Sequence, residues 1–589
     1  MIERFEVDDL HDARLASGTT GLLGRFNEAG VLAAPDVHVA SRTCALVGED
    51  DETVALAVGL AVRAARQGSV CVDLASLVDA DDSLPWPAVA GWLDRVAASP
   101  LVERSVVRVE QPLLYLDRYW REEGQVRDDL LARAAREAPE VDLPSLEASA
   151  ARLFPGSGYD EQRAAARAAA TQWTTVLTGG PGTGKTTTVA GLLALLTEQA
   201  ERTGSTLRIA LTAPTGKAAA RLQQAVEDAQ RGEQFDAADR ARLGGLSAST
   251  LHRLLGWRPD SRTRFRHHRG NKLPHDVVVV DETSMVSLTL MARLVEAVRP
   301  DARLILVGDP DQLASVEAGA VLFDLVQGLA ARTPESVAAL RTAHRYGETI
   351  GTLAEALRAG DAARVLELLR AGGSVELVDP ADGGAMGDVR RLLLDHALAL
   401  RSAALSGDAD EAVATMDRHR LLCAHREGPW GVQHWNRQVE RWLGDATGAP
   451  VGSGWGHEWY AGRPLLVTAN EYSLGLFNGD TGVVVRDGDD LRAVVAGVGE
   501  HQRFATSRLS EVETMHAMTI HKSQGSQARE VTVLLPPDDS PLLTRELFYT
   551  AVTRAQERVR VVATEASVVA AVERRAQRAT GLRRRLAGS

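Results

Sequence analysis

Residues 176–189 read Val-Leu-Thr-Gly-Gly-Pro-Gly-Thr-Gly-Lys-Thr-Thr-Thr-Val, so that an apolar strand pattern runs through a glycine-rich turn into a helix pattern. The turn fits G-x-x-x-x-G-K-[ST], the spacing of a phosphate-binding P-loop. Its glycines let backbone N–H groups face phosphate oxygens, and the following helix N-terminus favours negative charge. The nucleotide-binding residues predicted from this stretch are Gly179, Gly180, Pro181, Gly182, Thr183, Gly184, Lys185, Thr186 and Thr187.

Within this loop, Lys185 is expected to reach the β and γ phosphates of ATP, and the Thr186 hydroxyl is expected to hold Mg²⁺. Downstream, Asp281 and Glu282 end the apolar run at residues 277–280, as in a Walker B strand. Asp281 would support Mg²⁺, and Glu282 would orient and activate the attacking water. Read alone, the two carboxylates would fit an ordinary acidic turn equally well.

Four further side chains are candidates for the same site. Gln312, in the loop after the apolar run 304–307, can bond both a γ-phosphate oxygen and the water. Arg345 and Arg554 are candidate arginine fingers that a second lobe would bring to the γ-phosphate. Gln162 could read the adenine edge, although alone it also fits a solvated helix start. In so arginine-rich a chain, no single arginine is strong evidence.

The short β-rich runs at 176–178, 208–211, 277–280 and 304–307 alternate with helical segments, which predicts a parallel α/β sheet. Residues 1–150 carry helical patterns without a catalytic motif, and residues 154–158 read as a linker. Residues 460–512 are glycine-rich with short strands and suggest a small β-barrel insert. The tail from Glu573 carries six arginines, and we expect it to be exposed to solvent.

Composition sets wider bounds. With 589 residues, 45% hydrophobic and 25% charged, the chain can form three or four globular domains. Its net charge of -13 gives no indication of nucleic-acid binding, but such binding needs a basic groove rather than a basic molecule. Three scattered cysteines fit a reducing compartment. No signal-like start or membrane-length apolar run is found, so we expect a cytoplasmic protein.

Lysine is rare: the sequence has four, at positions 185, 217, 272 and 522, so 62 of the 66 Lys and Arg residues are arginine. Where arginine replaces lysine this widely, the remaining lysines indicate sites that need a compact ammonium group. Three of the four lie in polar motifs: Lys185 in 179–186, Lys217 in 213–219 and Lys522 in 519–526. Chance retention is accepted for Lys272.

The chain resembles superfamily 1 helicases, and within them the RecD family, the alpha subunits of RecBCD (exodeoxyribonuclease V) complexes. The resemblance covers residues from about 158 to 585 in motif order. The matching segments are 160–162, 179–186, 213–219, 250–252, 281–285, 308–312, 344–346, 519–526 and 549–554, with 476–482 typical of the family's barrel inserts.

This resemblance implies two RecA-like P-loop NTPase lobes with ATP and Mg²⁺ in the cleft between them. The expected divisions are a helical docking domain at 1–150, lobe 1A at 151–345 with an insert near 255–275, lobe 2A at 346–459 and 513–589, and an SH3-like insert, 2B, at 460–512. It also implies 5′→3′ movement on single-stranded DNA at a duplex end. Stand-alone relatives carry N-terminal helix-hairpin-helix modules; none is found here, which favours a heterotrimer with RecB and RecC.

Short polar side chains and lysines in the motifs of both lobes suit contacts to a DNA backbone, which position a strand without reading its sequence. His252 and His521 could also stack on sugars or bases. The predicted DNA-binding residues are Pro214, Thr215, Lys217, Thr250, His252, Thr519, His521, Lys522 and Gln524. The basic segment 257–272 could form a hairpin that touches DNA or a partner, or it could be a solvated loop.

Together these features predict an ATP-dependent 5′→3′ DNA helicase acting within RecBCD in double-strand break repair by homologous recombination. The alternatives are a stand-alone RecD-like helicase, an RNA helicase, a nuclease and a scaffold without activity. Complete ATPase motifs disfavour the scaffold. No carboxylate–lysine cluster supports a nuclease in the isolated chain, so exonuclease activity is expected only from the complex.

Overall fold

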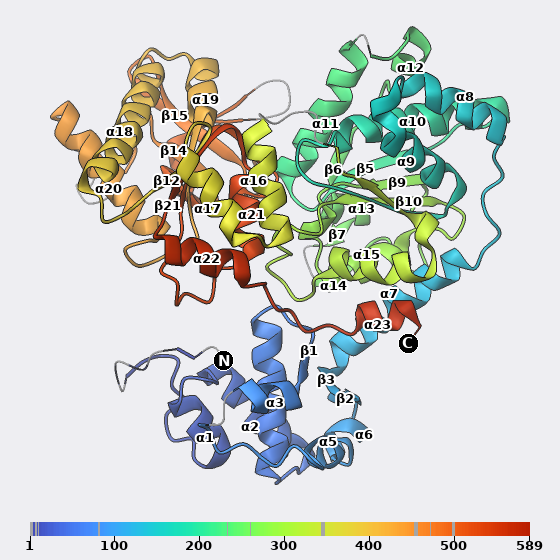
Figure 1. The fold of residues 1–589 in the computed structure, drawn as a ribbon, viewed down its shortest axis with the longest axis vertical. Helices are drawn as coiled ribbons and strands as arrows, with labels where there is room; N and C mark the ends of the chain where they lie inside the picture. The colour runs from blue at the N-terminus through green and yellow to red at the C-terminus, as the bar shows by residue number, and fades with distance from the viewer. Residues whose placement is uncertain are drawn as a thin grey trace.

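The computed structural model describes residues 4–588, apart from residues 6, 8, 10, 81–82, 233, 259–260, 343–347, 453–457, 472 and 497–500. Two α/β lobes lie side by side above a small N-terminal domain (Figure 1). Each lobe is built on one parallel sheet, as the alternating pattern of strands and helices predicts. Within the described ranges, every helix is too short or too polar to cross a membrane.

The N-terminal domain is mainly helical, as predicted, but it also holds a three-stranded antiparallel sheet in the order β1-β3-β2 that the sequence analysis did not predict. Its core forms around Phe26, Leu60 and Trp92, each at most 1% exposed. Its elements are α1 (Gly21–Glu28), α2 (Ala34–Val47), α3 (Glu52–Arg66), β1 (Cys71–Asp73), α4 (Leu74–Ala80), α5 (Trp92–Ala97), α6 (Pro100–Glu103), β2 (Val107–Glu110) and β3 (Leu113–Leu116).

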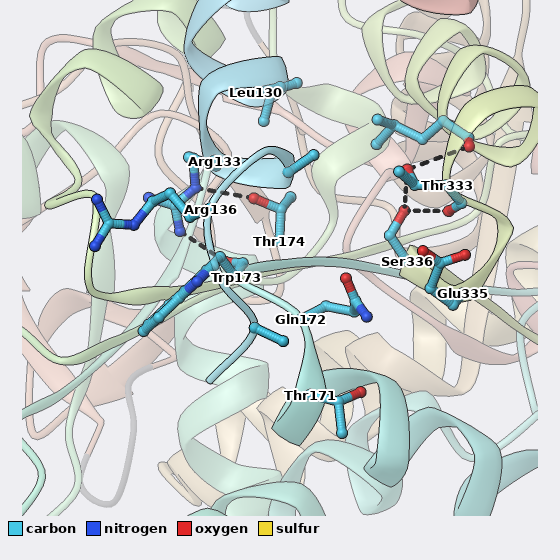
Figure 2. A pocket seen from close by; sticks show the side chains of 13 residues that line it. Leu130, Arg133, Arg136, Thr171, Gln172, Trp173, Thr174, Thr333, Glu335 and Ser336 are labelled. Atoms are coloured by element: carbon cyan, nitrogen blue, oxygen red, sulfur yellow. Dashed lines mark hydrogen bonds between the residues drawn. The ribbon is translucent and has the colours of Figure 1, made fainter. Parts of the chain in front are cut away.

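The boundary expected near residue 150 lies too late in the chain, because α7 (Asp117–Ala134) and α8 (Leu143–Leu153) pack against the first lobe. Arg133 of α7 is 4% exposed and donates to the Thr174 hydroxyl at 2.9 Å and to the carbonyl of Arg299 at 2.8 Å. Figure 2 shows this contact beside a cavity of about 210 Å³. The cavity lies at the amino end of a strand of the lobe, away from the P-loop.

The first lobe contains a six-stranded parallel sheet in the order β11-β4-β10-β9-β5-β6. Helices cover both faces, so its central strands read as continuous apolar runs; all four residues of 277–280 are buried. Its strands are β4 (Thr174–Gly179), β5 (Ile209–Ala213), β6 (Ala248–Thr250), β9 (Val277–Val280), β10 (Arg303–Gly308) and β11 (Val337–Leu340). Its helices are α9 (Asp160–Thr171), α10 (Lys185–Arg202), α11 (Gly216–Arg231), α12 (Ala237–Arg242), α13 (Leu251–Leu255), α14 (Leu288–Ala297) and α15 (Val321–Arg332).

The second lobe contains a five-stranded parallel sheet in the order β12-β21-β20-β13-β19. Its first part is mainly helical. Its helices are α16 (Glu348–Ala359), α17 (Ala362–Ala371), α18 (Gly383–Leu405), α19 (Ala409–Arg418), α20 (Val432–Thr447), α21 (Arg545–Val552) and α22 (Glu565–Glu573). Its strands are β12 (Val375–Val378), β13 (His419–Cys423), β19 (Ala517–Thr519), β20 (Ala528–Leu534) and β21 (Ala555–Val562).

A five-stranded antiparallel sheet, here called the β insert, interrupts the second lobe where the sequence predicts a small barrel. Its strands are β14 (Pro464–Val467), β15 (Thr481–Asp487), β16 (Asp490–Val495), β17 (Gln502–Ala505) and β18 (Val512–Thr514). The order β17-β16-β15-β14-β18 is that of an open sheet among the described strands, so closure into an SH3-like barrel stays a prediction.

The C-terminal tail was expected to be exposed, and that expectation is wrong for its end: residues 575–577 and 583 are exposed, but residues 581, 582, 585 and 586 are buried. Residues 574–587, here called the C-terminal strap, leave the second lobe and end in α23 (Leu582–Ala587), which packs against α15 and α7 (Figure 1). Leu582 and Leu586 are fully buried, and the Arg585 side chain is only 4% exposed. The arginine count suggested solvent, but the apolar residues at i and i+4 define a buried helix face.

Candidate functional site

Parallel strands place their carboxyl ends at one edge of a sheet, and the predicted site residues of the first lobe follow such ends. The P-loop follows β4, Asp281 follows β9, and Asp309 follows β10. The segments after β5 and β6 carry the predicted DNA contacts of this lobe. One edge of the first lobe therefore carries both the predicted nucleotide-binding residues and the predicted DNA-contacting residues.

The P-loop joins β4 to α10, as predicted, and two of its glycines have left-handed backbone angles, with φ +79° at Gly182 and +77° at Gly184. Lys185 Nζ lies over the loop and donates to the carbonyl oxygens of Gly179 at 2.6 Å and Gly180 at 2.9 Å. Burial lowers the pKa of Lys185, although nearby carboxylates oppose this shift. The ammonium group is therefore held at the loop, in the position from which it can bind phosphates.

Asp281 and Glu282 meet at the end of the buried strand β9. Burial and the neighbouring charge of Glu282 raise the pKa of Asp281 to about 6. Glu282 has a left-handed backbone (φ +49°), and its N–H donates to Asp281 Oδ1 at 2.9 Å. Such strain at a non-glycine residue is typical of functional sites.

The site fits Mg²⁺ on the chemistry of its donors. A carboxylate oxygen of Asp281 and the hydroxyl of Thr186 are hard oxygen ligands, and Mg²⁺ commonly takes one or two such protein ligands together with substrate phosphates.

Gln312 belongs to a buried hydrogen-bonded group that reaches the second lobe. Its amide nitrogen donates to Asp309 Oδ2 at 3.0 Å, and the hydroxyl of Tyr549 donates to the same oxygen at 2.9 Å. All three side chains are at most 5% exposed. The remaining amide oxygen of Gln312 has no partner among the described residues. Gln312 therefore keeps one bonding position for a ligand.

Gln162, on α9, is 2% exposed, so it is not the solvated helix-start residue that its sequence position also allowed. Its amide oxygen is buried without a partner in the part of the chain that the structure describes. Leaving a buried acceptor unpaired costs about 1–3 kcal/mol, which a ligand donor would recover. This unpaired oxygen fits the predicted adenine contact.

Of the two predicted arginine fingers, the structure describes only Arg554. Arg345 lies outside the described residues. Arg554 is 2% exposed, and it donates to the carbonyl oxygens of Thr550 at 3.1 Å and Ser526 at 3.3 Å within its own lobe. In this conformation, therefore, the guanidinium of Arg554 is bound to the backbone of the second lobe.

Sequence reasoning missed a different arginine, Arg358 on α16. A Cβ atom placed on Gly180 would lie only 2.6 Å from Arg358 Nη2. The surrounding sequence, Glu-Ala-Leu-Arg-Ala-Gly, is that of an ordinary helix end. In a chain with 62 arginines, nothing in the sequence distinguishes this one. Only the packing of α16 against the P-loop edge identifies this residue.

Hydrogen bonds join the two lobes directly. Leu313 N donates to the Thr550 hydroxyl at 2.9 Å, and Gln524 Nε2 donates to the Leu313 carbonyl at 2.6 Å. Gln524 is 6% exposed, so in this conformation it bridges the lobes rather than facing outward toward a DNA strand. Both contacts fall on the loop that carries Gln312.

Three predicted DNA-contacting hydroxyls also fix local backbone. Thr215 and Thr250 cap the N-termini of α11 and α13, accepting from the N–H groups of Ala218 and Arg253. Thr519 accepts from the Lys522 N–H at 3.3 Å. Each hydroxyl keeps its own hydrogen to donate to a phosphate oxygen, while Pro214 leads from β5 into the first of these caps.

Lys217 and Lys522, the two lysines predicted to contact DNA, have different surroundings. Burial and the charge of Arg420 lower the pKa of Lys217 to about 8. Lys522 Nζ instead lies 3.2 Å from the carboxylate of Glu513 on the β insert. Phe477, between β14 and β15 of the β insert, packs on Gly216: a Cβ atom added to Gly216 would lie 3.0 Å from the Cβ of Phe477. Lys217, the next residue, is therefore also close to the β insert.

The two predicted DNA-contacting histidines are both half-buried, and burial lowers the pKa of each. The ring of His252 lies 5.7 Å from that of Phe265, the last residue of β8 (Ser261–Phe265). His521 lies near Arg578 of the C-terminal strap, whose charge lowers its pKa further. At neutral pH these rings are therefore uncharged and suited to stacking.

The basic segment forms the expected hairpin, with β7 (Trp257–Arg258) paired to β8 (Ser261–Phe265). Part of its charge holds the fold together: Arg269 pairs with Asp129 of α7 at 2.7 Å, and Lys272 Nζ donates to the Glu296 carbonyl at 2.7 Å at the end of α14. Lys272 thus binds helix-end carbonyls, so its retention need not be chance.

Three family models match the chain: RecBCD enzyme subunit RecD, N-terminal domain, over residues 28–118; AAA domain over 162–318; and UvrD-like helicase C-terminal domain over 514–562. The chain is 61% identical over 583 residues to the RecBCD enzyme subunit RecD of Mycobacterium tuberculosis, covering 98% of this chain and 99% of that one. It is 34% identical over 417 residues to the ATP-dependent RecD2 DNA helicase of Deinococcus radiodurans, covering 70% of this chain and 50% of that one. A crystal structure of Bacteroides Pif1 bound to ssDNA covers 70% of this chain and 94% of its own, at 16% identity and a TM-score of 0.37.

Proposed function

The chain belongs to the RecD family of RecBCD enzyme subunits, and from this we propose that it is an ATP-dependent DNA helicase that moves 5′→3′ along single-stranded DNA. We further propose that it works with RecB and RecC at duplex ends, in double-strand break repair by homologous recombination. The polarity and the partners come from the family. What the chain itself contributes is the geometry of its cleft.

The observation that carries the proposal is the direct bonding of the nucleotide edge to the second lobe. Tyr549 donates to Asp309 across the cleft at 2.9 Å, and Thr550 accepts from the Leu313 N–H at 2.9 Å. A ligand that pulls on Gln312 must therefore disturb contacts with the other lobe. Binding energy at the phosphates can then shift the equilibrium between two lobe arrangements.

In the proposed reaction, a water oxygen attacks the γ-phosphorus of ATP, and the bond to the β–γ bridging oxygen breaks. Glu282 accepts the proton of the water, and Lys185 neutralises charge on the β and γ phosphates. Gln312 holds the water and a γ oxygen through its amide. Thr186 and Asp281 would hold Mg²⁺, which supplies positive charge against the phosphates.

Movement of the protein along DNA follows from the two sets of DNA-contacting residues, one on each lobe. Thr215, Lys217 and Thr250 belong to the first lobe, and Thr519 and His521 belong to the second. When the lobes approach each other, these two grips shift relative to each other along the DNA backbone. Release of ADP and phosphate reopens the cleft, and the motor advances.

The alternatives make different predictions. A stand-alone helicase of the RecD2 type would unwind DNA without partners, and an RNA helicase would prefer substrates carrying a 2′-OH. The subunit proposal is favoured because the chain is 61% identical over 583 residues to the mycobacterial RecD subunit but 34% identical over 417 residues to the RecD2 helicase. Co-purification of the native protein with two larger subunits separates these outcomes.

The test of the function uses Lys185→Gln. The variant removes the ammonium group that bridges the Gly179 and Gly180 carbonyls, and it should lose DNA-stimulated ATPase activity and unwinding by at least about 100-fold. Binding of single-stranded DNA and assembly with partners should persist. Unwinding at the wild-type rate by this variant would refute the proposed site.

A further inference from the structure

Gly180 is the point at which cations from both lobes approach the P-loop. Its carbonyl accepts from Lys185 Nζ at 2.9 Å. On its other side, a Cβ atom would lie 2.6 Å from Arg358 Nη2 and 3.1 Å from the Tyr549 hydroxyl. The guanidinium of the second lobe and the ammonium of the first lobe therefore approach the same residue.

Arg358 is held in place by neighbouring protein groups. Its Nη2 donates to the Tyr549 hydroxyl at 3.0 Å, and its Nε lies 3.1 Å from the carboxylate of Asp311. Its guanidinium also lies 5.6 Å from the centre of the Tyr549 ring. These neighbours raise the pKa of Arg358, so the group stays charged. A charged group fixed in advance needs little reorganisation during a reaction.

Its partners connect Arg358 to Gln312, the side chain predicted to bond the γ-phosphate and the water. The Tyr549 hydroxyl accepts from Arg358 Nη2 and donates to Asp309, which also accepts from the amide of Gln312 at 3.0 Å. Displacing Arg358 toward a phosphate would therefore disturb Tyr549 and, through Asp309, the side chain that holds the water. The chain of contacts runs from the second lobe to the reacting groups.

Arg358 and Arg554 differ in availability. Arg554 is 2% exposed, with its guanidinium bound to backbone carbonyls of its own lobe. The Arg358 side chain keeps 36% of its surface exposed, and Asp311, its ionic partner, keeps 34%. Moving Arg358 breaks a partly solvated ion pair, which costs less than breaking a buried one.

We propose that Arg358 is a catalytic residue of ATP hydrolysis, contacting the γ-phosphate from the second lobe. This inference rests on the proposed function. As the water oxygen bonds to the γ-phosphorus and the bridging oxygen leaves with its electron pair, negative charge is redistributed over the phosphate oxygens. The fork of the Arg358 guanidinium neutralises it there. Tyr549 is the positioning residue that keeps the guanidinium aimed at the loop.

The test compares Arg358→Ala and Arg358→Lys with Arg364→Ala, a control in the neighbouring helix α17, where Arg364 pairs with the exposed Glu367. All proteins are assayed as the full chain, for DNA-stimulated ATP turnover and for binding of ADP with and without aluminium fluoride. Arg358→Ala should lower kcat by about 100- to 1000-fold. Its affinity for ADP should change less than about twofold, while the tighter binding of ADP with aluminium fluoride is lost.

Arg358→Lys should recover little of the turnover, because an ammonium group cannot contact two phosphate oxygens as a fork does. Tyr549→Phe keeps the ring and removes only the hydroxyl, and it should lower kcat by about tenfold with ADP binding intact. This milder variant keeps the proposal testable should Arg358→Ala fold poorly.

The proposal is overturned if Arg358→Ala turns over ATP at the rate of the Arg364→Ala control, or if ADP affinity falls as far as kcat, which would indicate a structural role. The failure of the proposed function looks different: the wild-type chain itself would lack DNA-stimulated turnover. Wild-type activity that Lys185→Gln abolishes and Arg358→Ala preserves would reject this inference alone.

Discussion

Replacing Arg585 by methionine should loosen the C-terminal strap from the first lobe and the N-terminal domain. The Arg585 side chain is 4% exposed, donates to Glu110 at 2.5 Å, and has its Nε 3.5 Å from Glu123, which is fully buried. Methionine keeps most of the packing volume but leaves the Glu123 carboxylate without its cation. Removing one member of a buried pair costs about 3–5 kcal/mol. Because Glu123 also accepts from Thr580 at 2.7 Å and Gly581 at 3.1 Å, we expect a loss of about 3 kcal/mol.

The assay is native-state hydrogen exchange at the amides of α23, which reports the free energy of opening of this helix. A second variant, Glu123→Gln combined with Arg585→Met, removes the orphaned charge as well. It should recover at least about 1 kcal/mol, the signature of a coupled pair. The reasoning is refuted if Arg585→Met changes the opening free energy by less than about 0.5 kcal/mol, or if the losses of the two substitutions simply add.

Two further predictions concern the adenine contact and the pH dependence of the strap. Gln162→Ala should raise the KM for ATP by about 5- to 30-fold and reduce discrimination against GTP, because the buried amide that matches the adenine edge is gone; steady-state kinetics with both nucleotides test this, and an unchanged ATP preference would exclude the contact. Burial raises the pKa of Asp324 on α15 from 3.8 to about 7, so between these values the folded state holds a proton that the opened state releases, and the opening free energy of α23 should fall as pH rises through this window. Asp324→Asn should flatten that fall in hydrogen exchange, and equal pH slopes in the two proteins would contradict the assignment.

The sequence predicted those parts of the site that depend on local chemistry. The P-loop, the strand before Asp281 and the loop of Gln312 each pair an apolar run with a fixed set of polar residues, and a parallel sheet brings strand ends of this kind to one edge. These spacings require nothing from distant segments, so they can be read along the chain. The predicted strands at 176–178, 277–280 and 304–307 are confirmed as parts of β4, β9 and β10, and the run 208–211 begins one residue before β5.

What the sequence did not predict depends on packing between distant segments. Arg358 becomes a candidate only because α16 packs against Gly180, which lies 178 residues earlier in the sequence. The C-terminal strap was expected to be exposed because its arginines outnumber its apolar residues. In the structure, Arg585 pairs with Glu110 and Glu123, which lie more than 450 positions earlier in the sequence. Ion pairs of this kind have no periodic signature in either segment.

The measurement that bears most directly on the central claim is the direction of movement on single-stranded DNA. Stopped-flow experiments would use oligonucleotides of increasing length with a fluorophore at the 5′ or the 3′ end, with ATP supplied to the purified chain or its native complex under single-turnover conditions. We predict that the arrival time at a 3′-end fluorophore grows linearly with length, requires ATP, and disappears in the Lys185→Gln chain. A length-dependent signal that appears only at the 5′ end, or that survives in Lys185→Gln, would contradict a 5′→3′ motor driven from this cleft.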